Sequence, residues 1–326
     1  MTGQTRKLAT IFGGSGFIGT QLTQELARRG YSIRVAVRRP DLAGHVRMFG
    51  FPGQVQPVQA NLRFPDSVAA AMRGSDLVIN LVGIQFEKGR QRFGAVHVQG
   101  ARAVAEAARA AGIGTLIHMS ALGADPRSPS AYMRAKALGE DAVAKAFPQA
   151  TIIRPAPVFG PRDGFFNRLG FLARSFPIMP LIGGDARLQP VYVADVAEAI
   201  ANAADGMVKP GKAYELGGPE IVTMAEIVER VLEETMRKRF VLPLPQPIAR
   251  LAASLIAIWP SPLITPDQVT QLGLDTLVSP EAARQKRTLE AFGVTPTSMD
   301  AVLPAYMWRF RKNGEFDRHA NPLAES

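Results

Sequence analysis

Leu8-Ala-Thr-Ile-Phe-Gly-Gly-Ser-Gly-Phe-Ile-Gly19 is an apolar run followed by a glycine-rich turn, near the start of a 326-residue chain. The apolar run is typical of a buried strand, and an amphipathic helical pattern follows the glycines. Gly13 permits a tight turn, Gly16 lets backbone approach a pyrophosphate, and Gly19 lets the helix pack close to the strand. The free amides at the start of that helix would face the phosphates. The stretch therefore predicts a dinucleotide-binding turn.

The first two-thirds of the chain alternates strand-like and helix-like segments. The strand candidates are continuous apolar runs, as expected when helices cover both faces of a parallel sheet. We expect strands at Leu8–Phe12, Ser32–Val37, Val55–Gln59, Leu77–Leu81, Thr115–Met119 and Thr151–Ile153, and helices at Phe17–Arg29, Asp66–Met72, Phe93–Ala111 and Ala131–Ala146. This pattern predicts an α/β fold: a Rossmann doubly wound parallel sheet with a smaller mixed C-terminal unit.

Beyond Pro155 the alternation loosens. We expect a strand at Gln189–Val193, a helix at Asp195–Ala204, a strand at Ala213–Leu216, and a helix from the capping box Thr223–Glu226 to Arg239. The cations Arg237-Lys238-Arg239 would close that helix and complement its dipole. The domain boundaries expected are a Rossmann domain at 1–160 plus about 186–205, a smaller docking domain at 161–185 and 206–312, and a mobile tail at 313–326.

Composition excludes several function classes. The chain has no cysteine, which excludes disulfides and thiolate metal sites, and its four histidines are scattered without ligand-like spacing, so no metal site is expected. The net charge of +10 favours anionic partners, but the basic residues are dispersed and match no nucleic-acid module. The sequence shows no signal peptide and no transmembrane helix, which favours a bacterial cytoplasmic location.

The second expected strand ends in Val37-Arg38-Arg39-Pro40, about twenty residues after the glycines. Sites that prefer NAD place an acidic residue here to hold the ribose 2′-hydroxyl, whereas a guanidinium suits the 2′-phosphate of NADP(H). The arginines favour NADPH (NADP⁺) over NAD(H). The alternative is that both are solvated surface charges.

Tyr132-Met-Arg-Ala-Lys136 places a phenol and an ammonium on one face of an expected helix. A nearby ammonium stabilises a phenolate, which brings a phenol towards acid–base chemistry at neutral pH. Ser120, at the end of the fifth strand, is the candidate hydroxyl to orient a carbonyl. The expected cofactor-binding residues are Gly13, Gly16, Phe17, Ile18, Gly19, Arg38, Arg39, Asn61, Leu62, Leu81, Val82, Ser120, Tyr132, Lys136 and Pro155.

Only twelve positions separate Ser120 from Tyr132, which leaves a short loop to build a substrate pocket. Dinucleotide-binding enzymes that use such a Tyr–Lys pair usually carry the Ser or Thr one or two positions later, where this chain has Ala121 and Leu122. Both features argue against turnover. Tyr132 and Lys136 would then serve as ribose and nicotinamide contacts.

The glycine turn and the Tyr132/Lys136 pair resemble those of atypical, extended-type short-chain dehydrogenase/reductases. Four further stretches resemble the nucleotide-binding accessory subunits of respiratory complex I (NADH:ubiquinone oxidoreductase): Tyr132–Glu140, Arg154–Gly160, Gln189–Val196, and Phe240-Val-Leu-Pro-Leu-Pro with Pro262-Leu-Ile-Thr265. The likeness runs from about residue 8 to about residue 280, and the region 240–265 is its most discriminating part.

This resemblance implies a tightly held NADPH with a structural role, in a subunit that stabilises or assembles the peripheral arm near the membrane. It implies other complex I subunits as partners, with an anionic membrane surface as a further one, and a peripheral place on the cytoplasmic side of the bacterial inner membrane. Three alternatives stay open: a catalytic NADPH-dependent reductase or epimerase, an accessory protein of quinone biosynthesis, and a redox-sensing binding protein.

The apolar segment Pro247–Trp259 is too short to span a bilayer and contains Arg250. It would form a core helix of the smaller unit, or it would dock onto a partner or a bilayer surface. Tyr306–Lys312, which is basic and aromatic, would suit the same interface or pack as a terminal helix on its own domain.

Overall fold

The computed structural model describes residues 6–257 and 262–316, and it divides into two compact units. Unit 1 comprises the chain up to Pro155 together with Val193–Gly217 and Val278–Pro296. Unit 2 comprises Ala156–Tyr192, Gly218–Leu277 and the chain from Thr297 onward. Trp259 and most of the expected tail lie outside the described residues.

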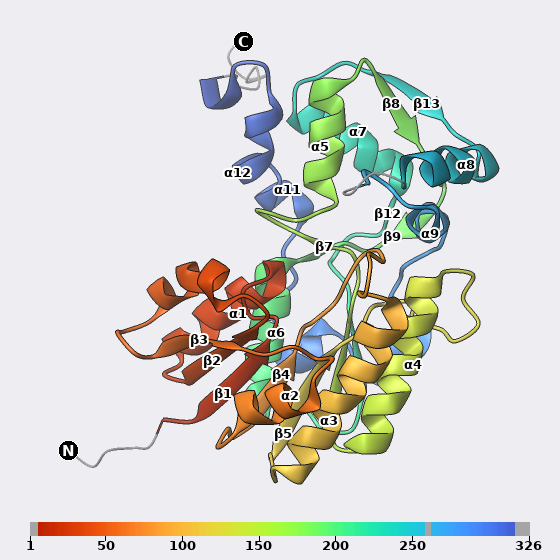
Figure 1. Ribbon diagram of the computed structural model, residues 1–326. Coiled ribbons are helices and arrows are strands. Elements are labelled where there is room, and N and C mark those ends of the chain that lie inside the picture. Colours follow the sequence, from red (N-terminus) through yellow and green to blue (C-terminus); the bar gives the residue numbers. More distant parts are fainter. Residues whose placement is uncertain (1–5, 258–261, 317–326) are drawn as a thin grey trace. The chain divides into compact units, whose positions relative to one another are not determined.

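Unit 1 is built on a seven-stranded parallel sheet with the order β11-β6-β5-β4-β1-β2-β3. The order reverses direction between β1 and β4, which is the switch point where doubly wound sheets bind ligands at the carboxyl ends of their strands. The strands are β1 (Leu8–Phe12), β2 (Ser32–Val37), β3 (Val55–Gln59), β4 (Leu77–Asn80), β5 (Thr115–Met119), β6 (Thr151–Pro155) and β11 (Ala213–Leu216). The expected fold class is confirmed (Figure 1).

Helices cover both faces of this sheet. They are α1 (Phe17–Arg28), η1 (Pro40–Phe49), α2 (Pro65–Met72), a π-helix η2 (Gly94–Gly100) that continues into α3 (Ala101–Ala110), α4 (Ala131–Ala146), α6 (Val193–Ala204), α10 (Pro280–Arg284) and η3 (Leu289–Phe292). Helix α1 packs against α6, while α3 packs against both α2 and α4. Parallel strands are therefore buried on both faces, which explains their continuous apolar sequences.

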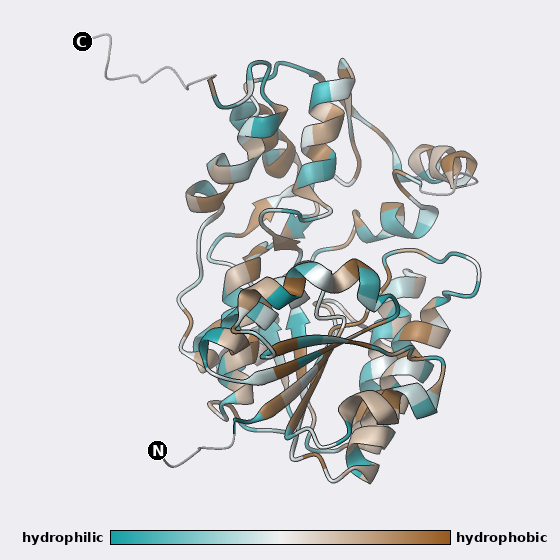
Figure 2. Cartoon of the chain, turned by 60° about the vertical axis from the view of Figure 1, so that its left-hand side comes forward, coloured by the Kyte–Doolittle hydropathy of each residue, from teal (hydrophilic) through white to brown (hydrophobic). Residues whose placement is uncertain are grey.

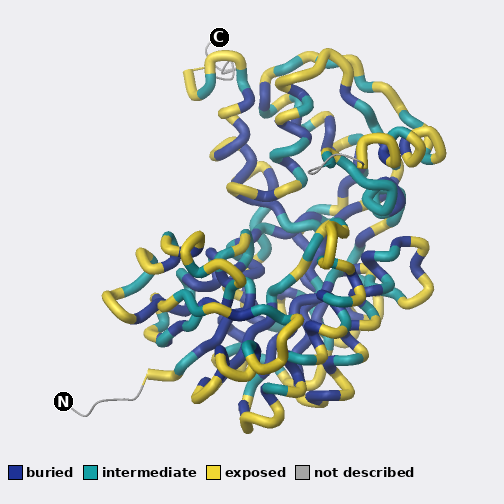
Figure 3. The backbone as a smooth tube through the Cα atoms, viewed as in Figure 1, coloured by how far each residue is buried: buried dark blue, intermediate teal, exposed yellow. Residues whose placement is uncertain are grey.

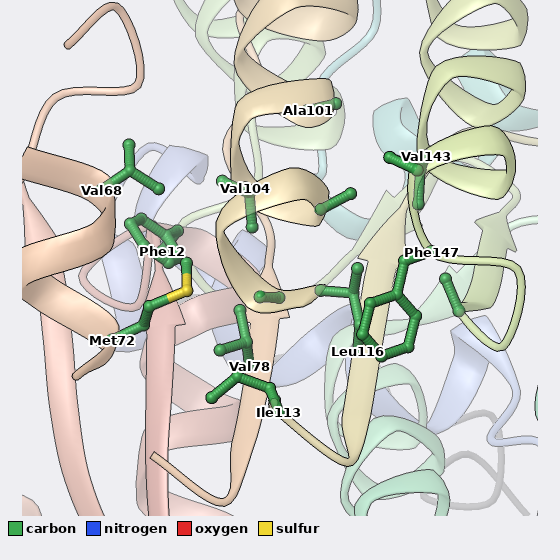
Figure 4. Packing of buried hydrophobic residues seen from close by; sticks show 14 of the residues in the cluster. Phe12, Val68, Met72, Val78, Ala101, Val104, Ile113, Leu116, Val143 and Phe147 are labelled. Atoms are coloured by element: carbon green, nitrogen blue, oxygen red, sulfur yellow. The ribbon is translucent and has the colours of Figure 1, made fainter. Parts of the chain in front are cut away.

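The core beneath α2, α3 and α4 contains Phe12 from β1, Val78 from β4 and Leu116 from β5, which meet Met72 and Val104 from the helices (Figure 4). Each of these side chains is at most 1% exposed. Hydrophobic residues appear in brown along several strands in Figure 2, and buried residues appear in dark blue in Figure 3. This packing fixes the strand ends that carry the candidate site.

A buried ion-pair network ties the sheet edge to α4. Arg154 on β6 donates to both carboxylate oxygens of Glu140 on α4, with a shortest distance of 2.6 Å, and its Nη1 lies 3.4 Å from Glu215 on β11. Glu215 in turn accepts the backbone N–H of Ser279 at 2.7 Å. Both carboxylates belong to buried residues, so each depends on this guanidinium for compensation.

Unit 2 contains three small two-stranded sheets and a set of helices. The strands are β7 (Val158–Phe159), β8 (Ile178–Leu181), β9 (Arg187–Leu188), β10 (Val191–Tyr192), β12 (Val222–Thr223) and β13 (Phe240–Pro243). The helices are α5 (Phe166–Ser175), α7 (Met224–Glu234), α8 (Gln246–Ile256), α9 (Pro266–Gln271), α11 (Met299–Val302), α12 (Pro304–Met307), η4 (Trp308–Phe310) and η5 (Gly314–Phe316). The Thr223–Glu226 capping box expected from the sequence is present.

Helix α8 buries one stripe and exposes another. Ala249 and Ala253 pack into a small core with Ile182 and Val269. Ile248, Leu251 and Leu255 on the other side are 56%, 67% and 66% exposed. Phe240 and Ile178, which are register partners in the β8–β13 ribbon, are also exposed. Helix α8 and the β8–β13 ribbon therefore leave more apolar side chains exposed than elements that only fill a core would leave.

Two expectations for unit 2 change. Helix α7 ends at Glu234 rather than Arg239, because Met236 adopts a left-handed φ of 52° and turns the chain. The arginine cluster thus lies beyond the helix, where Arg237 Nε donates to Phe310 O and Arg239 Nε donates to Ala173 O. The stretch Tyr306–Lys312 packs on its own unit, since Tyr306, Met307 and Phe310 are buried in its core.

The two units are divided at different residues from those expected. The segments 206–217 and 278–296 belong to unit 1, because β11 pairs with β6 and Arg287 O accepts the N–H of Glu215. The segment 186–192 belongs to unit 2, where β9 and β10 pair with β12 and β7. The pairing partners of these strands, which their own sequences do not specify, decide the boundaries.

Candidate functional site

The glycine turn after β1 has the geometry that its sequence predicts. Gly13 has a φ of +83°, and its N–H donates to Ala36 O at 3.1 Å on the neighbouring strand. A Cβ added to Gly19 would lie 2.3 Å from Gly13 O, so α1 can approach the strand this closely only without a side chain there. Added to Gly16, a Cβ would meet only Gly13 O, at 3.3 Å, so this position is open on its outer side.

Helix α1 begins at this turn without compensation from its own side chains. Its N-cap residue, Gly16, offers no side-chain acceptor, and its first turn contains no acidic residue. The amides of Phe17, Ile18 and Gly19 and the positive end of the helix dipole therefore suit an anionic group from outside. The residues present fit the pyrophosphate of a dinucleotide.

The carboxyl ends of the other parallel strands lie at the same edge of the sheet as the turn. A Cβ on Gly13 would lie 3.3 Å from both Leu81 C and Val82 N, so the residues after β4 border the turn. Asn80 Oδ1 accepts the N–H of Val82 at 3.2 Å and fixes this bend. Asn61 and Leu62 follow β3, and the Asn61 side chain accepts the N–H of Arg63. Pro155 is buried at the end of β6 and accepts the N–H of Leu122.

Arg38 and Arg39 follow β2 and have different surroundings. Arg39 forms a bidentate pair with Asp41, in which Nη2 lies 2.7 Å from Oδ2. Arg38 is exposed and makes no ion pair with any residue in the described ranges. Asp41, two residues beyond Arg39, was not among the expected site residues, and it forms an ion pair with one of the two guanidinium groups. Arg38 is accordingly the better placed of the two to meet a 2′-phosphate.

Lys136 and Tyr132 lie together on α4, as their spacing predicts. Lys136 is 5% exposed, its Nζ donates to Met119 O at 3.2 Å, and that nitrogen lies 5.7 Å from the centre of the Tyr132 ring. Burial lowers the pKa of Lys136 to about 8, and the negative charge of Glu140 opposes this shift. A cation that titrates near neutrality beside a phenol can hold or pass a proton.

Ser120 directly follows Met119, the residue whose carbonyl oxygen accepts a hydrogen bond from the Lys136 ammonium. Its side chain is buried, and its Oγ has no hydrogen-bond partner among the described residues. A buried hydroxyl without a partner costs free energy unless a ligand supplies one. This orphaned hydroxyl fits a bound group at the same site.

Two histidines that looked scattered in the sequence join this cluster. His97 lies in the π-helix η2, with its ring centroid 5.4 Å from that of Tyr132 and its Nε2 3.1 Å from Ile84 O. His118 on β5 faces Asn80 on β4 at 3.2 Å, because the two residues are register partners. Burial first, and then the Lys136 charge, lower the pKa of each histidine to about 3, so both are neutral.

Close packing of α4 on η2 holds Tyr132 and Lys136 against these histidines. A Cβ on Gly139 would lie 2.1 Å from His97 O, so only glycine permits this approach. The structure shows one feature that singles out His97: it lies in a π-helical turn, and such turns are often found at functional sites. That turn could not be distinguished from α-helix by periodicity.

The buried ammonium of Lys136 should make stability depend on pH. The folded-state pKa is depressed, so the unfolded chain binds more protons between about pH 8 and 10.5, and the free energy of unfolding should rise across that window. The rise attributable to Lys136 is at most roughly 3 kcal/mol. Urea unfolding of the cofactor-free protein and of Lys136→Met from pH 7.5 to 10.5 measures it. Parallel curves for the two proteins would contradict the buried-ammonium assignment.

The described residues, 6–257 and 262–316, contain neither a candidate metal site nor a candidate membrane span. No group of three or more His, Cys, Asp or Glu residues could hold a metal ion there. In the same ranges, the helices are too short or too polar to cross a membrane.

Comparison with known proteins agrees with this geometry. The model of the NAD dependent epimerase/dehydratase family matches residues 9–217, which contain the glycine turn, Tyr132 and Lys136. The chain belongs to this family. A solved structure with the same fold is the NADPH-dependent quinone oxidoreductase QOR2 of Escherichia coli complexed with NADPH, with a TM-score of 0.70 at 18% identity over 89% of this chain and 96% of that one.

Two relatives with different names are similar to this epimerase/dehydratase family member over most of its length. The mitochondrial NADH dehydrogenase [ubiquinone] 1 alpha subcomplex subunit 9 of Arabidopsis thaliana is 36% identical over 94% of this chain and 79% of its own length. The ceramide reductase of Caulobacter vibrioides is 32% identical over 82% of each chain. The resemblance to complex I accessory subunits of the short-chain dehydrogenase/reductase type is confirmed.

Proposed function

We propose that this protein is an accessory subunit of respiratory complex I that carries a bound NADPH with a structural role. The observation that carries the proposal is the similarity to a complex I subunit over nearly the whole chain, both units included. The glycine turn, the uncapped start of α1 and the orphaned Ser120 hydroxyl support a resident dinucleotide. Bound NADPH would supply binding free energy that stabilises unit 1.

NADPH is proposed over NADH because of Arg38, the arginine that Asp41 leaves available. A guanidinium pairs with a 2′-phosphate through charge-assisted hydrogen bonds and gains nothing comparable from a 2′-hydroxyl. Gly13, Gly16 and the first turn of α1 would hold the pyrophosphate. Tyr132 and Lys136 would hold the nicotinamide ribose.

Replacing Arg38 with alanine should weaken NADPH binding roughly tenfold or more and leave NADH binding within about twofold. Arg39→Ala is the matched control, since its guanidinium is already held by Asp41, and should cost NADPH less. Fluorescence titration of the cofactor-free protein with both dinucleotides measures the four affinities. Equal losses for NADPH and NADH in Arg38→Ala would defeat the 2′-phosphate assignment.

The proposed location is peripheral, on the cytoplasmic face of the bacterial inner membrane, with unit 2 docked onto a neighbouring subunit. The exposed apolar stripe of α8 (Ile248, Leu251 and Leu255) is the proposed contact. Unit 2 contains equal numbers of basic and acidic residues, so it has no net charge to attract an anionic bilayer. An apolar protein surface is therefore the proposed occupant.

The deciding experiment is affinity purification of the tagged chain from gently solubilised membranes, followed by native gel electrophoresis. The expected result is co-migration with NADH:quinone oxidoreductase activity and with stoichiometric NADPH. Substituting Ile248, Leu251 and Leu255 by serine should release the protein with its NADPH still bound. A protein that never enters the complex would refute the proposed role.

A second candidate function, a carbonyl reductase, is favoured by the assembled Ser120, Tyr132 and Lys136 and by the relative named ceramide reductase. Ser120 would orient the carbonyl, Tyr132 would donate the proton, and Lys136 would lower the cost of the phenolate. Its test is oxidation of bound NADPH by a panel of carbonyl-bearing lipids. Turnover that Tyr132→Phe abolishes, with NADPH affinity retained, would replace the structural role by this one.

A further inference from the structure

Unit 1 has a cluster of positively charged side chains that lies far along the chain from the glycine turn. An open hollow of about 350 Å³ lies between the loop from α6 to β11 and the turn after α10. Four cations line it: Lys209, Lys212, Lys286 and Arg287. None of the described lining residues is acidic. Since unit 2 is neutral by sequence, the whole net charge of +10 belongs to unit 1, and this hollow contributes to it.

The hollow is distinct from the dinucleotide site. Lys212 immediately precedes β11, so it lies at the amino ends of the parallel strands. The glycine turn follows the carboxyl end of β1, at the opposite edge of the same sheet. A cofactor bound at the glycine turn would therefore leave these four cations uncompensated.

Arg287 is fixed in place but incompletely bonded. Its Nη1 donates to Ala213 O at 2.9 Å, and its backbone O accepts the N–H of Glu215 on β11. Its Nε is buried and has no acceptor among the described residues. A guanidinium anchored through one nitrogen, with another N–H unsatisfied, is pre-organised to bind an anion after a small side-chain shift.

Lys286 occupies a position where glycine is the ordinary residue. It follows α10 with a left-handed φ of 51°, and the N–H groups of Lys286 and Arg287 close the helix end on Ala283 O and Ala282 O. A residue with a Cβ in this conformation costs about 1 kcal/mol relative to glycine. The strained residue, Lys286, is thus one whose side chain lines the hollow.

The wall behind the cations is ordered and partly apolar. The Tyr214 ring packs edge-on against Phe292 at 5.0 Å, its hydroxyl donates to Lys209 O, and Met207 and Val208 complete that side. Together these features fit a compact, multiply charged anion better than a long peptide. We propose that this hollow is a binding site for a phosphate-bearing ligand.

The test uses inorganic pyrophosphate as the probe, on the full chain saturated with NADPH and also without it. Titration calorimetry gives the affinity, and hydrogen–deuterium exchange should place the protection at 207–212 and 285–291. Protection confined to the glycine turn at 13–19 would overturn the proposal, whatever the affinity. Because the readout is local, it separates failure of this site from failure of the proposed cofactor role.

Lys286→Gly is the informative variant because it removes a cation and relieves strain at once. Its Tm should equal or exceed that of the wild type, while pyrophosphate affinity should fall roughly fivefold or more. Arg162→Gly is the matched control: Arg162 also has a positive φ, 77°, and does not line the hollow. Unchanged affinity in Lys286→Gly, or an equal loss in Arg162→Gly, would overturn the proposal.

The source of the phosphate is distinguished by vesicles. If the ligand is a lipid headgroup, the wild type should float with phosphatidylglycerol-containing vesicles but not with pure phosphatidylcholine, and Lys286→Gly should lose that flotation. If it is a free phosphate compound, pyrophosphate should bind while neither kind of vesicle does. Binding of neither probe would refute the site.

Discussion

Replacing Gly139 with alanine is expected to lower the free energy of unfolding by about 3 kcal/mol or more. The added Cβ would lie 2.1 Å from His97 O and 3.1 Å from His97 C, both rigid backbone atoms. Helix α4 would have to move off η2, and overpacking against backbone is not relieved by a rotamer change. Tyr132 and Lys136 lie on the same helix, so NADPH binding should weaken in parallel. Urea unfolding with and without NADPH measures both effects.

Gly94→Ala is the control for this prediction. Gly94 begins η2, has no positive φ, and offers open space to an added Cβ. It should leave stability unchanged or raise it by up to about 1 kcal/mol, since alanine favours helix over glycine. If Gly139→Ala behaves like Gly94→Ala, the close approach of α4 to η2 is not what holds Tyr132 and Lys136.

Arg154→Met should cost about 3 to 5 kcal/mol of stability, because it leaves the buried carboxylates of Glu140 and Glu215 without their counter-ion. Methionine preserves much of the side-chain volume, so the loss reports charge more than packing. Chemical denaturation at neutral pH measures the change in the free energy of unfolding. The effect should reach β11 as well, since Glu215 joins that strand to Arg154.

Two comparisons separate charge from packing. Adding Glu140→Gln and Glu215→Gln to Arg154→Met should restore much of the lost stability, because no uncompensated charge then remains. Arg187→Met breaks an equally short but more exposed pair with Asp275 and should cost less than about 1 kcal/mol. An unrestored triple variant would mean that the Arg154 side chain acts mainly by filling space.

The elements of unit 1 were predictable because each is specified locally. The strand ranges Leu8–Phe12, Ser32–Val37 and Thr115–Met119 agree residue for residue, as does the helix Ala131–Ala146. Apolar runs bounded by turn residues carry this information without reference to the rest of the chain. Unit 2 was less predictable, since its two-residue strands and single-turn helices have too few residues to show a period.

The candidate site likewise contains some residues that the sequence predicts and others that it does not. Gly13, Tyr132 and Lys136 follow from motif spacing, whereas His97 and His118 do not. His118 meets Asn80 only through the register of β5 against β4, and His97 reaches Tyr132 only because Gly139 allows two helices to touch. The Arg39–Asp41 pair is a different case, because the two residues are only two positions apart and their pairing is a local contact. Register and close approach are tertiary properties that one sequence does not display.

The interleaving of the two units has a consequence for synthesis on the ribosome. The sheet of unit 1 lacks its edge strand until β11 has emerged, and Arg287 follows some seventy positions later. At the usual pace of translation, about 5–20 residues per second, the nascent sheet would spend seconds with β6 as an unpaired edge. Arg154 would meanwhile lack its second carboxylate partner, Glu215. Release of a chain truncated near residue 155 should therefore yield an aggregation-prone fragment rather than an independent cofactor-binding domain.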